Sequence, residues 1–109
     1  MQYAPDVGEA FATAALLDYE GAAVHNLDGE VMAVSDLIAL LATLVPASAG
    51  QISCSDVPLP LVSSVDGSSF VGLLGRSLMR SANDGVRDAV ERFRGLLKDG
   101  LVAAPSPAP

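Results

Sequence analysis

The sequence predicts a small mixed α/β fold, in which a mixed sheet of short strands is packed by three main helices. Apolar residues recur at helical spacing in three stretches, residues 6–17, 36–45 and 82–98. Two shorter stretches, residues 23–27 and 51–54, have strand composition and are bounded by turn residues. The switch between a helical and a strand period therefore predicts helices and a sheet in one domain.

The first predicted helix spans residues 6–17. Asp6 is its predicted N-cap, because Glu9 three residues later completes the outline of a capping box. One apolar stripe runs along it, made of Val7, Ala10, Phe11, Ala14 and Ala15. The predicted strand at 23–27 follows and leads into an Asp-Gly pair, which is typical of a tight turn.

The second predicted helix spans residues 36–45, where a Ser-Asp pair offers an N-cap and Pro46 stops the helix. This helix is apolar on most of its circumference, so we expect it to be buried on more than one side. After the predicted strand, a shorter helix is expected at 67–74, closed by Gly75.

The last predicted helix spans residues 82–98. Ser81 and Asp84 form a second capping-box outline at its start. We expect the domain to cover residues 1–102. Residues 103–109 contain three prolines and are predicted to be a disordered tail.

Composition limits the possible partners and compartments. The 109 residues suffice for one domain, and the formal net charge is −7. Residues 1–75 contain nine acidic side chains and no basic one, so a phosphate-binding stripe is missing and we expect no nucleic-acid partner. No apolar run approaches the roughly 18 residues of a membrane span. With no visible signal peptide, a cytoplasmic protein without a membrane partner is expected.

Short motifs in a particular order carry a family resemblance. They are Tyr3, Asp6, Val7, Ala10, Phe11, Asn26, Leu27 and Gly29, then Leu74, Gly75, Ser81, Gly85, Val86 and Phe93. From Tyr3 to about Val102 the chain resembles the C-terminal, substrate-binding lobe of the NAD-dependent epimerase/dehydratase family, the extended short-chain dehydrogenases/reductases. The resemblance implies that lobe's mixed fold without the Rossmann half. It also implies the substrate-binding part of an NAD(P)-dependent sugar or sugar-nucleotide isomerase or oxidoreductase.

The family's catalytic motifs are missing from this chain. The family uses a Tyr-x-x-x-Lys pair for acid/base chemistry and a G-x-G-x-x-G loop for the cofactor. Here the fourth residue after Tyr3 is Val7, the fourth after Tyr19 is Ala23, and Lys98 is the only lysine. We therefore predict no catalytic residue and no cofactor site in the chain. NAD(P) is implied only for the full-length family, and the chain alone is expected to be inactive and not to bind NAD(H).

The resemblance suggests three substrate-binding candidates. Sugar-nucleotide epimerases often carry an Arg just before the helix that here follows Asp66, but residues 61–65 contain no cation. Bidentate recognition of a diphosphate is missing there, which argues against a nucleotide-sugar substrate. Arg76 or Arg80 is then the candidate for an anionic group, and Asn26 is a candidate to orient a ligand.

The sequence gives little support to a metal site or to a catalytic cysteine–histidine pair. His25 is the only histidine, which excludes a histidine-rich metal site, so no metal is expected. Cys54 and His25 form a conceivable catalytic dyad of an independent small enzyme, although a free cysteine usually behaves as a small hydrophobe.

Two arrangements of partners follow from these expectations. One is a missing N-terminal cofactor-binding half that completes the enzyme. The alternative is a free-standing dimerisation or partner-binding module derived from such a lobe. We expect a homodimer, because the predicted helices expose apolar surface that monomers usually avoid. Its interface is expected to include Leu37, Leu40, Leu41 or Phe11.

Overall fold

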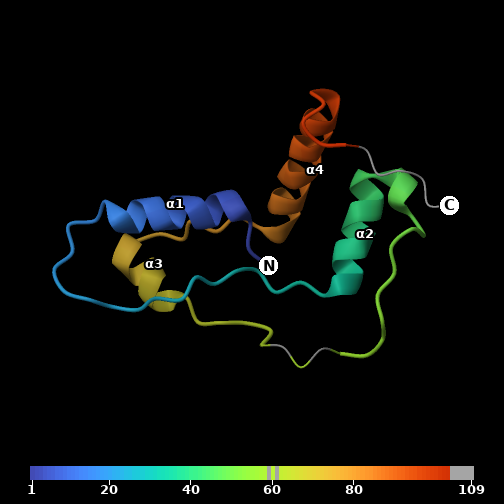
Figure 1. Ribbon diagram of the computed structural model, residues 1–109. Helices are drawn as coiled ribbons and strands as arrows, with labels where there is room; N and C mark the ends of the chain where they lie inside the picture. Colours follow the sequence, from blue (N-terminus) through green and yellow to red (C-terminus); the bar gives the residue numbers. More distant parts are fainter. Residues whose placement is uncertain (59, 61, 104–109) are drawn as a thin grey trace.

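The computed structural model describes residues 1–58, 60 and 62–103, and its helices are joined by long extended segments (Figure 1). The elements are α1 (Ala4–Ala15), α2 (Val34–Leu44), the 3-10 helix η1 (Pro46–Ser48), α3 (Ser68–Leu74) and α4 (Ala82–Lys98). The described residues contain no β-strand, so the predicted mixed α/β fold with a sheet is wrong, and this part of the chain is all-helical. Most of the predicted disordered tail, residues 104–109, lies outside the described residues.

The two predicted strands are extended or turned segments that have no neighbouring strand. A strand needs a partner along its whole length to satisfy its backbone groups. Within 23–27, the Leu27 carbonyl accepts a hydrogen bond from the Gln2 side chain at 2.5 Å, and no ladder continues from it in the described residues. In 51–54, the Gln51 amide closes a turn onto the Ser48 carbonyl at 3.0 Å. Strand composition favours an extended backbone but does not provide the second strand.

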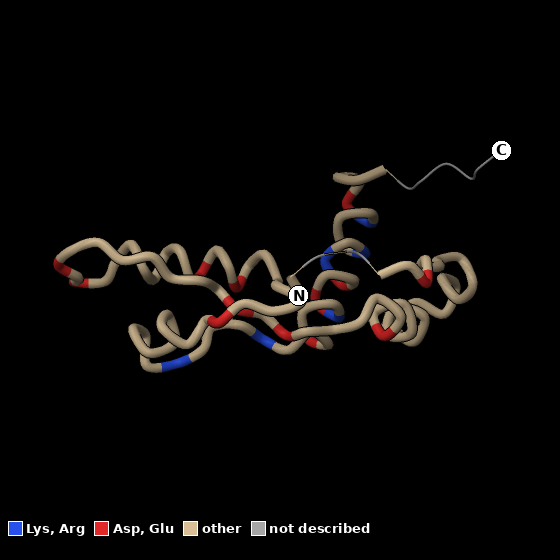
Figure 2. The backbone as a smooth tube through the Cα atoms, turned by 90° about the horizontal axis from the view of Figure 1, so that it is seen from below, with Lys and Arg blue, Asp and Glu red and all other residues tan. Residues whose placement is uncertain are grey.

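The chain makes one long circuit. In Figure 1, α1 and α3 lie at one end, α2 lies at the other, and α4 rises between them. Residues 16–33 pass around the end of α1 and run to α2, and the chain then returns along the lower side to α3. The radius of gyration is 17.5 Å, against about 13 Å for a compact domain of this length. The fold is therefore open and elongated, as the view from below also shows (Figure 2).

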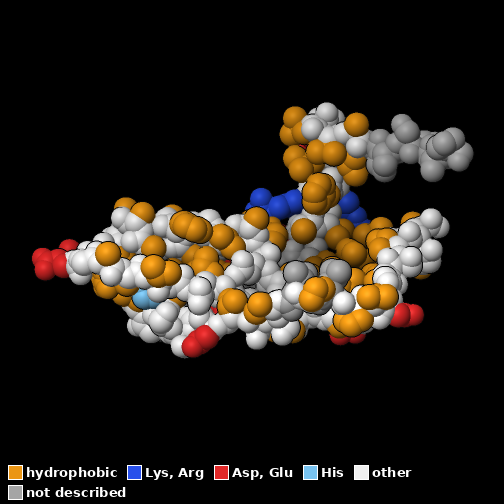
Figure 3. All heavy atoms as spheres, turned by 60° about the horizontal axis from the view of Figure 1, so that its bottom comes forward, with side chains coloured by type: hydrophobic (Ala, Val, Ile, Leu, Met, Phe, Trp, Pro, Cys, Tyr) orange, Lys and Arg blue, Asp and Glu red, His pale blue; other side chains and the backbone are white. Residues whose placement is uncertain are grey.

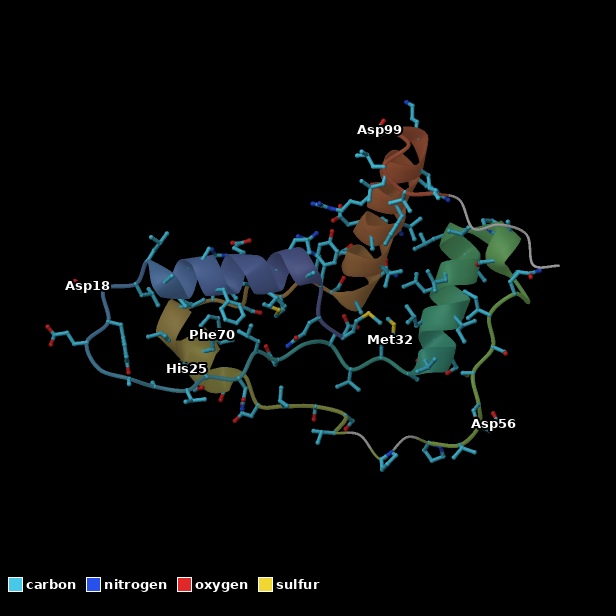
Figure 4. The ribbon with its side chains drawn as sticks, in the orientation of Figure 1. Asp18, His25, Met32, Asp56, Phe70 and Asp99 are labelled. Atoms are coloured by element: carbon cyan, nitrogen blue, oxygen red, sulfur yellow. The ribbon has the colours of Figure 1, made fainter. Side chains whose placement is uncertain are left out.

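Burial in this fold is sparse. The buried hydrophobic residues are Ala10, Phe70, Ala82 and Val86. Phe70 of α3 lies beneath α1, next to His25 (Figure 4). No large side chain of the described residues is fully buried, and α2 has no buried residue. The expected burial of the second helix on more than one side is therefore wrong.

Three helix ends follow the predicted local chemistry. The Ser81 hydroxyl caps α4 by accepting a hydrogen bond from the Asp84 amide at 3.1 Å. At the end of α3, Gly75 adopts φ +72°, the left-handed conformation that glycine tolerates best. The α2 helix stops before Pro46, as expected.

The start of α1 differs from the prediction. The helix begins at Ala4, its N-cap is Tyr3, and Pro5 occupies the first turn, where a missing amide proton costs nothing. Asp6 therefore lies inside the first turn and does not cap the helix. Its carboxylate is used in a contact with the segment before α4, described next.

Candidate functional site

Five side chains form a polar cluster at the base of α4, which we call the Arg80 cluster: Tyr3, Asp6, Arg80, Asp88 and Arg92. Its centre is Asp6, which is only 2% exposed. One carboxylate oxygen accepts the Arg80 backbone amide at 2.9 Å, and the other accepts the Arg80 Nε at 2.8 Å. Burying a charge is expensive unless it is paired and hydrogen-bonded, and Asp6 is both.

The outer part of the Arg80 cluster balances its charges. The Arg80 guanidinium lies over the Tyr3 ring, 4.5 Å from its centre, at the distance of a cation–π contact. The Tyr3 hydroxyl donates to Asp88, which also lies 3.7 Å from Arg80 Nη1. Arg92 Nε donates to the same Asp88 oxygen at 3.1 Å, from one turn further along α4. Two arginines thus face two aspartates, and little free charge is left for a ligand.

A second set of contacts joins the N-terminus to the segment before α2. The Glu30 side chain accepts the Ala82 amide at 2.6 Å, and a carboxylate is favourable at the N-terminus of a helix. The Met1 ammonium group donates to the Glu30 carbonyl, and the Gln2 amide reaches the Asp28 carbonyl at 3.2 Å. The chain's own carboxylate therefore occupies the N-terminus of α4, where a phosphate would otherwise bind.

Two glycines allow this close approach. A Cβ at Gly29 would lie 2.2 Å from the Met1 carbonyl oxygen, which is backbone and cannot rotate away. A Cβ at Gly85 would lie 3.2 Å from the Tyr3 Cβ. Packing thus dictates the residue type at Gly29, whereas a methyl group at Gly85 would require only that Tyr3 shift by a few tenths of an ångström.

A polar hollow of about 280 Å³ opens beside the cluster. Its lining residues are Asp28, Gly29, Glu30, Ser77, Met79, Arg80 and Ser81. Arg80 is the only cation there, and its guanidinium is already paired with Asp6. Carboxylates and hydroxyls dominate the remaining polar groups. They are suited to bind the hydroxyl groups of a neutral ligand and would repel a phosphate.

The structure does not bring the three predicted substrate residues together. Arg80 lies in the cluster, whereas Arg76 forms a surface ion pair with Glu9 of α1, at 3.5 Å. Asn26 is exposed, and no described contact joins it to either arginine. Their role in binding a substrate stays a prediction.

His25 has a partner that the sequence did not indicate. Its Nδ1 lies 3.1 Å from the Ser69 hydroxyl, and its ring stands 5.9 Å from that of Phe70. No carboxylate hydrogen-bonds to His25 in the described residues, so the third group that orients a catalytic histidine is missing. Cys54 is exposed, and no hydrogen bond joins it to His25 within the described residues. No group of three potential metal ligands occurs in the part of the chain that the structure describes.

One carboxyl group has a perturbed pKa. The Ser68 backbone amide donates to Asp66 Oδ1 at 2.9 Å, and this bond, followed by one from the Ser68 hydroxyl, lowers the pKa of Asp66. The group is fully exposed, so the shift reflects the turn that starts α3 and marks no reactive site.

Sequence reasoning missed most partners in the cluster. Glu30 and Ala82 are 52 residues apart, and Tyr3 and Asp88 are 85 residues apart. Local spacing carries no signal for such pairs. One local signal did exist: Pro5 favours a helix start before Asp6, which would have freed that carboxylate for a tertiary contact.

No helix of the described residues is both long and apolar enough to cross a bilayer. Comparisons with protein-family models, with curated proteins and with solved structures give no match to this chain.

Proposed function

We propose that the chain is the substrate-binding portion of an NAD(P)-dependent epimerase/dehydratase-like protein and works with a separate cofactor-binding half. One observation carries the proposal. Two residues of the first family-like motif, Tyr3 and Asp6, belong to the Arg80 cluster, and Gly85 of a later motif packs against the Tyr3 side chain. Residues of two motifs that are far apart in the sequence thus meet at one place.

The chemistry of the polar hollow suggests a class of substrate. Arg80 is 38% exposed at its side chain and is neutralised by a buried aspartate, so it is a weak phosphate receptor. The carboxylates of Asp28 and Glu30 and the hydroxyls of Ser77 and Ser81 can bind sugar hydroxyls. A sugar-type group fits this hollow better than a diphosphate. Of the three substrate contacts that the resemblance suggests, Arg80 lines the hollow, whereas Asn26 and Arg76 do not.

The chain itself does not fit a dinucleotide. Dinucleotide sites place the pyrophosphate at a helix N-terminus that follows a glycine-rich loop. The sequence has no such loop, and Glu30 occupies the N-terminus of α4. The chemistry of the cofactor would have to come from the other half, and this chain would bind and orient the substrate.

The test begins with the protein as it occurs in its source. The native protein is tagged and purified from its source, and the purified polypeptide and any protein bound to it in equal amount are identified by peptide mapping. One of these polypeptides should contain a G-x-G-x-x-G loop and a Tyr-x-x-x-Lys pair. NADH fluorescence should then saturate with the purified native species and should not change with the 109-residue chain alone. A native species without either motif, or saturable NADH binding by the chain alone, would overturn the proposal.

A matched pair of variants then tests the site. Arg80→Gln should raise the Michaelis constant of the completed enzyme for its sugar substrate, because the hollow loses its orienting group. Arg87→Gln changes the same charge on an exposed part of α4 and lines no wall of the hollow, so it should leave the constant unchanged. Equal effects of both variants would contradict the placement of the substrate at Arg80.

A further inference from the structure

An apolar groove runs between α2 and α4, and its volume is about 490 Å³. We call it the α2/α4 groove, and its lining residues are Met1, Leu37, Leu41, Val45, Val86, Ala89, Val90, Phe93, Arg94 and Leu97. The groove is open to solvent and lined almost wholly by apolar side chains. A contiguous exposed apolar surface of this kind is typical of a site that another molecule covers.

A small molecule is a poor occupant. Ligand pockets combine apolar walls with a few polar groups that fix the ligand's orientation. Arg94 is the only polar lining residue of the groove, and its Nη2 donates to the Leu44 carbonyl at 2.9 Å, at the end of α2. Among the described residues, no other polar side chain lines the groove to orient a ligand, whereas an apolar helix face needs no such group.

The chain as a whole exposes more surface than a compact protein of its mass. The chain exposes 8192 Å², about 2,500 Å² more than the roughly 5,700 Å² of a compact protein of this mass. Deducting the largest area that the eight residues outside the description can expose, at about 1.45 Å² per dalton, leaves a surplus of about 1,500 Å². A standard interface covers about 800 Å² on each partner, and obligate homodimers cover more. Apolar side chains are spread over the length of the molecule in the space-filling view (Figure 3).

The apolar stripe of α4 is complementary to a copy of itself. Val86 at its start is buried, while Phe93 and Leu97 toward its end are 59% and 43% exposed. These two side chains both line the groove and project from it. A two-fold interface uses the same surface on both copies, so this surface needs both projecting side chains and a groove that can receive them. We propose that a second copy of this chain fills the groove, with α4 packed antiparallel to α4 about a two-fold axis at Phe93.

The apolar stripe of α4 agrees with this register, because antiparallel pairing about Phe93 brings Ala89 of one copy level with Leu97 of the other. Arg92 and Arg94 flank Phe93 and would lie beside the same two residues of the other copy. Each side chain already binds within its own chain, however, to Asp88 and to the Leu44 carbonyl respectively. The net charge of −7 opposes association only weakly at physiological salt, where the screening length is about 8 Å. Moreover, the basic side chains are confined to α4 and the segment before it (Figure 2).

The experiment is a mass measurement on the full chain and two variants. Light scattering at micromolar concentration should give twice the 11.1 kDa of the chain. Phe93→Glu should convert the dimer to a monomer and raise its dissociation constant by about 100-fold or more, because a carboxylate would be buried without a partner. Phe11→Glu is the matched control: Phe11 is a 70% exposed phenylalanine on α1, outside the groove, and its variant should stay dimeric.

A cross-link keeps the test decisive if Phe93→Glu fails to fold. On a two-fold axis, a residue meets its own copy, so Phe93→Cys in a Cys54→Ser background should form a disulfide-linked dimer under mild oxidation. Phe11→Cys in the same background should not. A monomeric wild-type chain, an unchanged dissociation constant for folded Phe93→Glu, or cross-linking by Phe11→Cys alone would overturn the proposal. A mass of one chain plus an unrelated protein would do so too. NADH plays no part in these measurements, so their outcome is independent of the proposed function.

Discussion

The Arg80 cluster and the α2/α4 groove both join segments that are far apart in the sequence, but they do so by opposite means. In the cluster, a buried carboxylate is matched atom for atom, and charges balance. In the groove, apolar walls face each other across about 490 Å³ of space, and one arginine bridges them at the rim. Directional polar contacts therefore hold together the segments that meet at the base of α4, whereas the apolar walls of the groove are not closed by the described residues.

The stability of the isolated chain is therefore expected to depend on the few polar contacts of the Arg80 cluster. Hydrophobic burial normally supplies the main stabilising term of a fold. Here the described core is small, so changes in the cluster should matter more than changes along the exposed helix faces. The predictions below test this contrast in order of expected effect.

The largest effect is expected for Asp6→Ala. It leaves the Arg80 backbone amide and guanidinium without their acceptor and should lower the free energy of unfolding by about 3 kcal/mol. Glu9→Ala removes the other arginine-binding carboxylate of α1, from a pair that is more than half exposed, and should cost about 0–1 kcal/mol. Urea unfolding measures both. Similar losses would mean that the cluster contributes no more than a surface ion pair.

The next effect separates two glycines. Gly29→Ala forces a methyl group against the Met1 carbonyl and should cost about 1–3 kcal/mol. Gly8→Ala, in α1 with no atom within 4 Å of the added carbon, should stabilise the protein by up to about 1 kcal/mol. Opposite shifts of the thermal midpoint check this. A neutral Gly29→Ala would show that the N-terminal segment does not need its close contact.

A smaller effect is expected for one hydroxyl. Tyr3→Phe keeps the ring beneath Arg80 but removes the donor to Asp88, so it should cost about 0.5–1.5 kcal/mol. Tyr19→Phe is the control, because Tyr19 is half exposed and its hydroxyl has no hydrogen bond within the described residues. Chemical denaturation of both variants decides whether the bond contributes.

The smallest effect concerns the change in stability at acidic pH that Asp66 causes. Because the pKa of Asp66 is lowered in the folded state, the group adds stability above its unfolded pKa, and this is lost as the pH falls through the folded value. Ser68→Ala keeps the amide and should move the pKa of Asp66 only part of the way back. Ser68→Pro removes the amide at a position where proline is tolerated, and should restore the ordinary value. Carboxyl NMR titration measures each midpoint. Equal midpoints in the two variants would assign the shift to the hydroxyl.

Local sequence predicted those parts of the fold that local chemistry determines. The ends of α2, α3 and α4 follow from Pro46, Gly75 and Ser81, whose effects extend only over one turn. The strands failed because pairing depends on a second segment, which neighbouring residues do not specify. Of the candidate site, the sequence points to Arg80 only as a candidate for an anionic group, and it predicts that Asp6, 74 residues away, is a helix cap.

The pairing of Asp6 with Arg80 has a consequence for synthesis on the ribosome. The carboxylate emerges among the first residues, and its partner is translated 74 residues later. At about 5–20 residues per second, α1 waits about 4–15 s for the side chain that neutralises Asp6. During this interval the nascent chain has apolar helices without a fixed crossing. Asp6 is neutralised only when the segment before α4 has been made.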